Sequence, residues 1–533
     1  MSHAPTSSSS APMTHRQILQ ALSGLLMAMF VAILSSTVVS AALPRIISDL
    51  DGGQSAYTWV VTATLLTMTI STPIWGKFAD LVDRKRLLQL GLVIYLTGSI
   101  LAGFATSTGW LIACRALQGV GVGALTALVQ VILADLVSPR ERGRYMGYLG
   151  AVFGVGTVAG PVVGGLLTDH LGWRWCFFVG VPFALAALVV LQRTLHLPAR
   201  RRDGVHLDLV GGTLLAGGVS AILIWVSLAG KQFAWGAWQT PVLVAGGLAL
   251  VAAAVAVERR TREPLIPLDL FQHRTVALAV VASVAVGVAM FGTTVFLSQY
   301  MQLARGYSPT ESGLLTIPMV IGLFAASTIA GRYISATGRY RRIMLAGGLA
   351  LTGGLALMGL IDERTSLVEV AAFMLVVGAG IGMLQQNLVL AVQNVVPRSE
   401  LGTGSALIAF FRSLGGAIGV SAMGAVLASK VTASVAAGLE AKGIRGGAGG
   451  DGAIPDLAAL PAPVREVVEH AYGTGVAEIF LLAAPLGLIA TLAVWFLREV
   501  PLGTKSGIEL ASEDARPAEP TTRPRELATA GAR

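Results

Sequence analysis

The sequence predicts an all-α polytopic membrane protein with 14 transmembrane helices, in which two six-helix halves flank two inserted helices. Composition is the first reason: hydrophobic residues make up 54% of the 533 residues and charged residues only 13%, against roughly 25% charged in soluble domains. The second is that the apolar residues gather into long runs, and the third is that basic residues cluster between those runs. These features exclude a soluble enzyme, a disordered protein and a disulfide scaffold.

A bilayer crossing needs about 20 apolar residues, and fourteen windows reach this length. They are 17–43, 56–76, 87–106, 110–134, 146–168, 175–195, 208–229, 239–257, 275–302, 310–333, 343–361, 367–395, 403–429 and 475–497. The first run is too long for the core of a signal peptide, so we interpret it as a membrane helix.

The distribution of basic residues predicts the orientation. Although the net charge is +9, the basic residues lie in short loops, which argues against a nucleic-acid partner. Alternate loops and the two ends hold 27 of the 38 Lys and Arg residues, counting Arg193 and Arg332 at the edges of their windows with the adjoining loops; the opposite loops hold 9, and Arg115 and Arg412 lie deeper within spans. Cytoplasmic loops carry such an excess. We therefore expect a multi-pass protein of the plasma (inner) membrane with both termini in the cytoplasm.

The domain organisation follows from these spans. We expect a disordered cytoplasmic leader (1–15), an N-terminal half (16–200), two inserted helices (201–260), a C-terminal half (261–500) and a disordered cytoplasmic tail (501–533). Within the C-terminal half, residues 430–474 form a Gly-, Ala- and Pro-rich external loop in which Pro463–Tyr472 could be one short helix.

An internal repeat relates the two halves. The segments Gly76–Arg86 and Gly331–Arg342 both begin with glycine and a basic residue and continue to a basic cluster. A second pair, Leu136–Gly143 and Val395–Gly402, follows the fourth helix of each half. Duplicated halves related by an axis along the membrane normal are a transporter architecture, with the cargo site near the midplane.

Several ordered motifs resemble those of a known family. They are Gly76–Arg86, Arg115–Gly119, Gly156-x-x-x-Gly160-Pro161-x-x-Gly164-Gly165, Trp173–Trp175 with Pro182, and Glu258 to Phe271. Together they resemble the fourteen-span drug:proton antiporters of the major facilitator superfamily, over residues 16–430 and the last span. The resemblance implies the major facilitator fold and multidrug efflux by proton antiport through alternating access. It also implies that the chain is not an enzyme and needs no cofactor.

The first motif is a candidate conformational latch made of Gly76, Asp80, Arg84 and Lys85. The resemblance implies that this loop closes the cytoplasmic side against the opposite half, where span 13 begins. Asp80 can pair with the basic cluster or face a helix N-terminus. The alternative is that these basic residues only set the topology.

The span-5 motif is a candidate hinge. Gly156, Gly160 and Gly164 lie on one helix face, where small residues let helices approach closely. Pro161 removes one backbone hydrogen bond and can bend the helix. We expect this helix at the interface of the two moving halves, with ordinary glycine packing as the alternative.

The candidates for proton coupling are Arg115, Asp80 and Asp135. The resemblance associates the arginine with coupling, although Arg115 could instead snorkel to the external interface. The family's first-span acid is replaced here by Ser35, and no acid lies deep in any span. This departure argues against a buried carboxylate for proton exchange or for binding lipophilic cations.

The expected substrate cavity is apolar with scattered polar groups. Its candidate residues are Ser35, Thr37, Gln118, Phe291, Gln385, Asn387 and Arg412. All seven histidines lie outside the membrane core, so no metal site is expected. We expect a monomer whose partners are small amphipathic substrates, protons and the lipid bilayer.

Three other functions remain to be weighed. A primary pump is disfavoured because the sequence contains no phosphate-binding loop. A membrane-embedded enzyme is disfavoured because the sequence places no catalytic cluster within the spans. Export of lipids or lipid-like metabolites on the same fold stays open as the alternative.

Overall fold

The computed structural model describes residues 15–52, 54–195, 197, 208–230, 232–261, 264–444 and 461–504. The predicted leader, most of the predicted tail and the centre of the predicted external loop lie outside these residues. Apart from one isolated bridge between Ala229 and Phe233, all regular structure in the described ranges is helical. The prediction of an all-α protein is therefore confirmed.

The N-terminal half consists of six long helical segments. They are α1 (His15–Asp49), α2 (Gln54–Leu81), α3 (Arg84–Gly103), α4 (Thr108–Leu136), α5 (Pro139–His170) and the pair α6 (Trp175–Phe178) and α7 (Gly180–Thr194). Side chains cap several helix starts: Ser107 accepts from Trp110 N, and Ser138 accepts from Glu141 N. Because such residues satisfy the free amides of the first turn, they fix where the helices begin.

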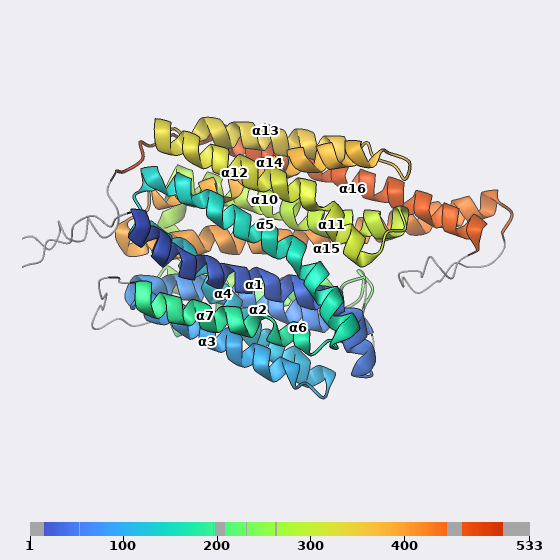
Figure 1. The fold of residues 1–533 in the computed structure, drawn as a ribbon, viewed down its shortest axis with the longest axis horizontal. Helices are drawn as coiled ribbons and strands as arrows, with labels where there is room; N and C mark the ends of the chain where they lie inside the picture. Colours follow the sequence, from blue (N-terminus) through green and yellow to red (C-terminus); the bar gives the residue numbers. More distant parts are fainter. Residues whose placement is uncertain are drawn as a thin grey trace, which may run out of the picture.

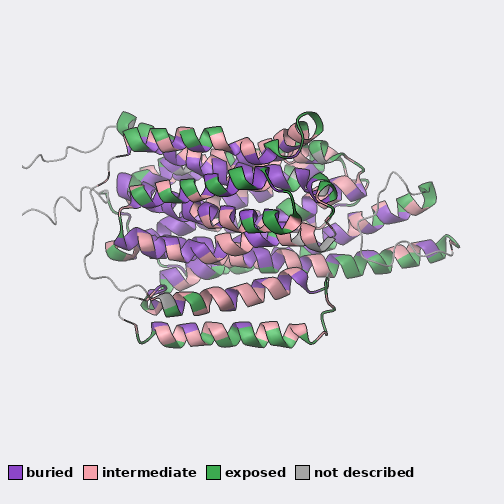
Figure 2. Cartoon of the chain, turned by 90° about the horizontal axis from the view of Figure 1, so that it is seen from below, coloured by how far each residue is buried: buried purple, intermediate pink, exposed green. Residues whose placement is uncertain are grey.

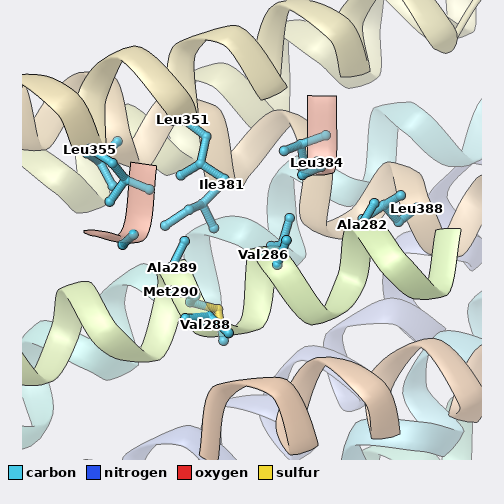
Figure 3. Packing of buried hydrophobic residues seen from close by; sticks show 14 of the residues in the cluster. Ala282, Val286, Val288, Ala289, Met290, Leu351, Leu355, Ile381, Leu384 and Leu388 are labelled. Carbon is cyan, nitrogen blue, oxygen red and sulfur yellow. The ribbon is translucent and has the colours of Figure 1, made fainter. Parts of the chain in front are cut away.

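The C-terminal half repeats this arrangement with more interruptions. It contains the 3-10 turn η1 (Leu268–Gln272), α10 (Arg274–Gln299), the π-helical turn η2 (Tyr300–Ala304), α11 (Pro309–Leu315), α12 (Ile317–Thr337), α13 (Arg341–Met358), α14 (Leu367–Gln393), the 3-10 turn η3 (Arg398–Glu400), α15 (Leu401–Ala441) and α16 (Ala462–Phe496). Figure 3 shows Val286 and Ala289 of α10 facing Leu351 of α13 and Ile381 of α14. This apolar cluster forms the core of the half.

The inserted pair lies on the outside of the bundle. It comprises α8 (Leu209–Leu228) and α9 (Gln239–Glu258). Val219 and Leu223 of α8 pack with Phe410 of α15, and Leu66 of α2 lies against the same cluster. Since α2 belongs to one half and α15 to the other, α8 bridges the seam between them.

Both described ends of the chain lie at one end of the bundle, where α1 begins and α16 ends (Figure 1). We call this the terminal end and the opposite one the far end. Buried residues concentrate in the middle of the bundle, and exposed ones lie along its outer helices and at the far end (Figure 2). A lipid-facing outer surface is expected for such an arrangement.

Twelve of the described helical segments are long and apolar enough to cross a membrane. The helices α2 and α13 are not among these twelve, yet α2 packs against α4 and α13 packs against α14 and α16 within the same bundle. Counting both would give the fourteen predicted spans. The fourteen-span count therefore stays a prediction that is consistent with this architecture.

The predicted external loop is largely helical where it is described. The helix α15 runs on to Ala441, and α16 starts at Ala462. The prediction of one short helix at Pro463–Tyr472 therefore underestimated the helical part of this segment. At 41 residues, α15 is about 60 Å long, twice the roughly 30 Å thickness of the hydrocarbon core. The two helices therefore continue beyond the bundle at its far end (Figure 1).

The projecting parts of α15 and α16 form a hairpin that is held by matching contacts. Lys430 Nζ lies 2.8 Å from Glu478 Oε2, and Lys442 Nζ lies 2.5 Å from Glu466 Oε2. Gly438 packs against Val467 between these two ion pairs. Apolar contacts and charge pairing explain why the sequence continues as helix here despite its many small residues.

Candidate functional site

The two halves touch along two seams, α2 against α15 and α5 against α12. A glycine pair makes the closest approach in each seam, Gly76 with Gly402 and Gly143 with Gly331. A Cβ atom on any of these four glycines would overlap backbone atoms of the opposite half. Larger residues at these positions would separate the helices.

The internal repeat explains why the two crossings resemble each other. Gly76 and Gly331 open the two copies of the first repeated segment, and Gly143 and Gly402 close the two copies of the second. Each copy of the first segment therefore meets the second segment of the other half. The duplicated sequence builds the same contact twice.

Asp80 joins the halves at the first crossing. Its Oδ1 accepts a hydrogen bond from Gly402 N at 2.8 Å, and its Oδ2 accepts from Thr403 N at 2.8 Å and from Thr403 Oγ1 at 2.9 Å. These donors belong to the first turn of α15. Because the first amides of a helix have no intrahelical acceptor, a carboxylate there stabilises the helix start.

Arg84 connects this carboxylate to a second acid within the N-terminal half. Its Nη2 lies 3.3 Å from Asp80 Oδ1 and its Nη1 lies 2.5 Å from Asp135 Oδ2, while its Nε donates to Ala79 O. The three side chains are buried, so the group forms a compact ionic cluster at the ends of α2, α3 and α4. Asp135 contacts Arg84 and does not itself reach the opposite half.

Lys85 lies apart from this cluster. Its Nζ donates to Gln192 O of α7, 2.9 Å away, within the same half. The latch residues that the structure brings together are therefore Gly76, Asp80 and Arg84, and Lys85 instead ties α3 to α7.

A different chemistry joins the halves at the second crossing. Arg140 donates to the carbonyl oxygens of Ser335 and Ala336, both at 3.2 Å. Arg142 donates to Gln393 Oε1 of the opposite half. An arginine acting on main-chain oxygens thus takes the place of the aspartate that acts on main-chain amides at the first crossing.

Amides connect α4 and α14 slightly deeper in the bundle. Gln130 Nε2 donates to Gln386 Oε1 at 2.7 Å, and Gln393 Nε2 donates to Gln130 O at 3.3 Å and to Ser405 Oγ at 2.7 Å. Gln130 lies six residues from the end of α4, or about 9 Å along the helix. Among the described residues named in these bonds, Gln130 and Gln386 lie well inside their helices rather than at the helix ends.

Among the described residues, all these hydrogen bonds between the halves lie toward the terminal end. They come from Asp80, Gln130, Arg140, Arg142 and Gln393. The structure therefore represents a state in which the halves are bonded to each other at the terminal end.

The predicted hinge residues pack mostly within their own half. A Cβ on Gly156 would contact Ile33, and one on Gly160 would overlap Thr37, so both glycines lie against α1. Thr37 Oγ1 also donates to Gly156 O at 3.0 Å. Pro161 contacts Gly313 of the opposite half. Gly164 is buried on the same helix.

A second glycine face of α5 meets the opposite half and was missed in the sequence. It comprises Gly143, Gly147, Gly150 and Gly154, which lie against Gly331, Thr328, Ser327 and Val320 of α12. The spacing of four, three and four residues is the pattern of one helix face. This spacing was the available signal, and the stronger resemblance of Gly156–Gly165 to a known motif obscured it.

Arg115 lies in a buried polar cluster on the N-terminal half. Its Nη1 donates to Gln118 Oε1 at 2.9 Å, and Gln118 Nε2 donates to Ser99 Oγ at 2.7 Å. Tyr95 is fully buried beside this group and also hydrogen-bonds Ser35. Arg115 is only 4% exposed, which argues against snorkelling to the interface.

The other predicted cavity residues lie in different environments. Thr37 and Asn387 use their side chains within the helical framework, since Asn387 Nδ2 donates to Met383 O at 2.7 Å. Gln385 is buried on α14, and Phe291 lies half-buried against Gly416. Arg412 is half-buried on α15.

Comparisons with known proteins agree with this architecture. The profile described as Major Facilitator Superfamily matches residues 25–420. An uncharacterized MFS-type transporter of Mycobacterium tuberculosis is 36% identical over 481 residues, which cover 90% of this chain and 69% of that protein. Multidrug transporter protein MdtP of Bacillus subtilis is 35% identical over 407 residues, which cover 76% of this chain and 74% of that protein. The solved proton:xylose symporter XylE, at 13% identity, matches with a TM-score of 0.63 over 94% of this chain and 100% of that chain, a likeness of fold alone.

Proposed function

The chain belongs to the major facilitator superfamily of membrane transporters, and on this premise we propose that it exports amphipathic or hydrophobic compounds such as drugs, dyes and antibiotics. Export would cross the plasma membrane by proton antiport through alternating access. The family consists of transporters rather than enzymes, and the all-α major facilitator fold predicted from the sequence is confirmed.

The names of relatives support export. Besides the Bacillus multidrug transporter, the chain is 31% identical over 516 residues to a protein of Pseudozyma antarctica called an MFS-type efflux pump. Each name states the activity of the relative that carries it. We extend efflux to this chain because the similarity covers 93% of it and 94% of the relative.

The observation that carries the mechanism is the one-ended bonding of the halves. Asp80 accepts three hydrogen bonds from the start of α15, and the other polar contacts between the described halves lie toward the same end. Such bonds have to break before the cargo site can open toward that end. A bistable contact of this kind suits a transporter that exposes its site to one side at a time.

In this proposal, the glycine pairs and the polar bonds have different roles. Glycine pairs let the helices touch closely, and Asp80 supplies hydrogen bonds to the start of α15 that form only when they touch. Arg84 pairs with Asp80 and with Asp135 within the N-terminal half. With both termini in the cytoplasm, as the distribution of basic residues predicts, the bonded end is the cytoplasmic one. The described conformation would then be the one that releases cargo outside.

Transport into inverted membrane vesicles tests this function directly. Vesicles containing the protein should accumulate a fluorescent amphipathic dye when the vesicle interior is made more acidic than the outside. A proton uncoupler should abolish the accumulation. Vesicles without the protein provide the control. Accumulation that is insensitive to the uncoupler would refute proton antiport, and no accumulation of any tested compound would refute export.

Export of lipids or lipid-like metabolites remains the second candidate. It is favoured by the lack of any described acid in the middle of a span, because such cargo needs no carboxylate partner. Movement of a fluorescent phospholipid between leaflets of reconstituted vesicles, without dye transport, would favour this alternative.

A further inference from the structure

Two guanidinium groups lie inside the helical bundle without an acid to balance them. They belong to Arg115 of α4 and Arg412 of α15. Among the described residues, the acids lie in loops, close to helix ends or on the projecting hairpin, where Glu478 at its base pairs with Lys430. The described interior of the bundle therefore carries an excess of positive charge.

Arg412 occupies the middle of the bundle. Its carbonyl oxygen is the atom that a Cβ added to Gly287 would meet first, and Gly287 lies near the centre of the 26-residue α10. No hydrogen bond or ion pair among the described residues involves the Arg412 side chain. A half-buried cation at this depth therefore has no partner in the described part of the chain to stabilise its charge.

The helical spacing shows which way Arg412 faces. Ser405 precedes it by seven residues, or two helical turns, and therefore lies on the same face of α15. Ser405 Oγ accepts a hydrogen bond from Gln393, which also reaches Gln130 of the opposite half. Arg412 thus lies about 10 Å deeper than this polar bridge, on the face that turns toward the interior between the halves.

Arg115 has only neutral partners. Its Nη1 donates to Gln118, and Tyr95, Ser99 and Ser35 complete the surrounding polar cluster. Its Nε is buried without a hydrogen-bond partner. The N-terminal half therefore also presents a cation whose charge is uncompensated.

We propose that the transported compounds are amphipathic anions, whose carboxylate, sulfonate or similar group binds the guanidinium of Arg412 at the centre of the bundle. This inference rests on the export function proposed above. A planar guanidinium binds planar or tetrahedral oxyanions through paired hydrogen bonds. Phe291 packs against Gly416, one turn from Arg412, and offers an apolar surface for the rest of the compound.

The surrounding charges favour the same class of cargo. A lipophilic cation entering this interior would meet Arg412, with the buried Arg115 as a second positive charge and no described carboxylate, and like charges inside a protein repel more strongly than in water. A neutral compound would leave the arginines unbalanced. An anion, by contrast, balances the guanidinium charge of Arg412.

A matched pair of dyes provides the test. Anilinonaphthalene sulfonate and anilinonaphthalene share one ring system and differ by the anionic group. Proteoliposomes of the full chain should transport the sulfonate at least about tenfold faster than the neutral dye, the difference expected for one charged hydrogen-bond partner in a buried site. Ethidium, a lipophilic cation, should be the poorest of the three substrates.

Three variants assign the effect to Arg412. Arg412→Gln should lower transport of the sulfonate at least about tenfold and change transport of the neutral dye little, because a charged hydrogen-bond donor is lost. Arg412→Lys should keep part of the sulfonate transport because the charge remains. Arg364→Gln removes an exposed guanidinium at the far end and should behave as wild type.

The outcomes separate failure of this inference from failure of the export function. If wild type transports the neutral or cationic dye as fast as the sulfonate, the anionic class is wrong while export stands. If none of the three dyes moves, the export function fails with it. The comparison of dyes on wild type needs no variant, so poor folding of Arg412→Gln would not protect the proposal.

Discussion

Asp80 is buried, and its carboxylate is surrounded by hydrogen-bond donors. The first turn of α15 supplies three hydrogen bonds, and Arg84 supplies a fourth contact at 3.3 Å. A carboxylate is suited to this position because it accepts through both oxygens and donates through neither. The full set of contacts of Asp80 therefore forms only when the two halves touch.

Asp80→Asn should weaken the bonded state. The amide has one acceptor oxygen, and its NH₂ group would face the donors of α15, so about 2 kcal/mol of contact between the halves is lost. We expect gradient-driven export into inverted vesicles to fall at least about tenfold. Asp83→Asn is the matched control, since Asp83 caps α3 by accepting from Lys85 N and Asn caps equally well. Equal activity of the two variants would remove Asp80 from the mechanism.

Arg115→Ala and Ser35→Ala should differ in the same vesicle assay. Removing Arg115 leaves Gln118 without its donor and deletes a buried cation, so export should be abolished. Removing the Ser35 hydroxyl takes one neutral partner from Tyr95 and should leave most of the export. The reverse result would make Ser35 part of the cargo site and would take the coupling role away from Arg115.

Single residues also show where sequence reasoning ends. The importance of Asp80 follows from its place in a basic motif, but its partners are main-chain amides more than 300 residues away. The amide of Gly402 has no sequence signature as a donor. Similarly, nothing in the sequence distinguishes Lys85, which binds α7, from Arg84, which joins the ionic cluster.

At the scale of helices, α5 carries two glycine faces with different partners. Gly156 and Gly160 face α1 in the same half, and Gly143 and Gly147 face α12 in the other. One face fixes α5 to its own half, and the second forms part of the seam. We infer that motion between the halves uses the second face while the first stays packed.

Gly160→Ala should disrupt the first face. The added Cβ overlaps the side chain and backbone of Thr37, and such overpacking costs about 1–3 kcal/mol. We expect lower thermal stability and a large loss of export. Gly165→Ala is the control, because the nearest neighbour of its Cβ is Thr310 Oγ1 at 3.4 Å, an ordinary contact. If both variants retained wild-type melting temperature and export, close packing of α1 on α5 would be unimportant.

Helix positions could be predicted well wherever the apolar windows decided them. The window 110–134 lies within α4 and the window 275–302 matches α10 with its π-helical turn. Prediction failed for α15 and α16 beyond the membrane, because Ala- and Gly-rich stretches such as Ala433–Gly438 suggest a loop. Tertiary contacts such as Lys442 with Glu466 stabilise helix there, and window hydropathy does not capture such pairs.

At the scale of the whole molecule, the predicted orientation places the terminal end in the cytoplasm. Cysteines at positions 339 and 364 test this in a background lacking Cys114 and Cys176, which are both buried. Arg339 lies in the loop between α12 and α13 and Arg364 in the loop between α13 and α14, so only one short helix separates the two sites. In intact cells a membrane-impermeant thiol reagent should label position 364 only.

Permeabilised cells provide the control, because both positions should then react. Labelling at position 339 but not at position 364 in intact cells would show that the orientation is the reverse of the predicted one. Labelling at both positions there would mean that α13, which is not among the twelve apolar candidates, does not cross the membrane.

The two glycine crossings have the geometry of a symmetric dimer contained in one chain. In a twofold homodimer, residue i of one subunit contacts residue j of the other and j contacts i. Here Gly76 meets Gly402 while Gly331, the counterpart of Gly76, meets Gly143, the counterpart of Gly402. A six-helix ancestor that paired with itself would have possessed both contacts before its gene was duplicated. Fusion would then have freed each copy to diverge, leaving an aspartate to make one contact and an arginine to make the other.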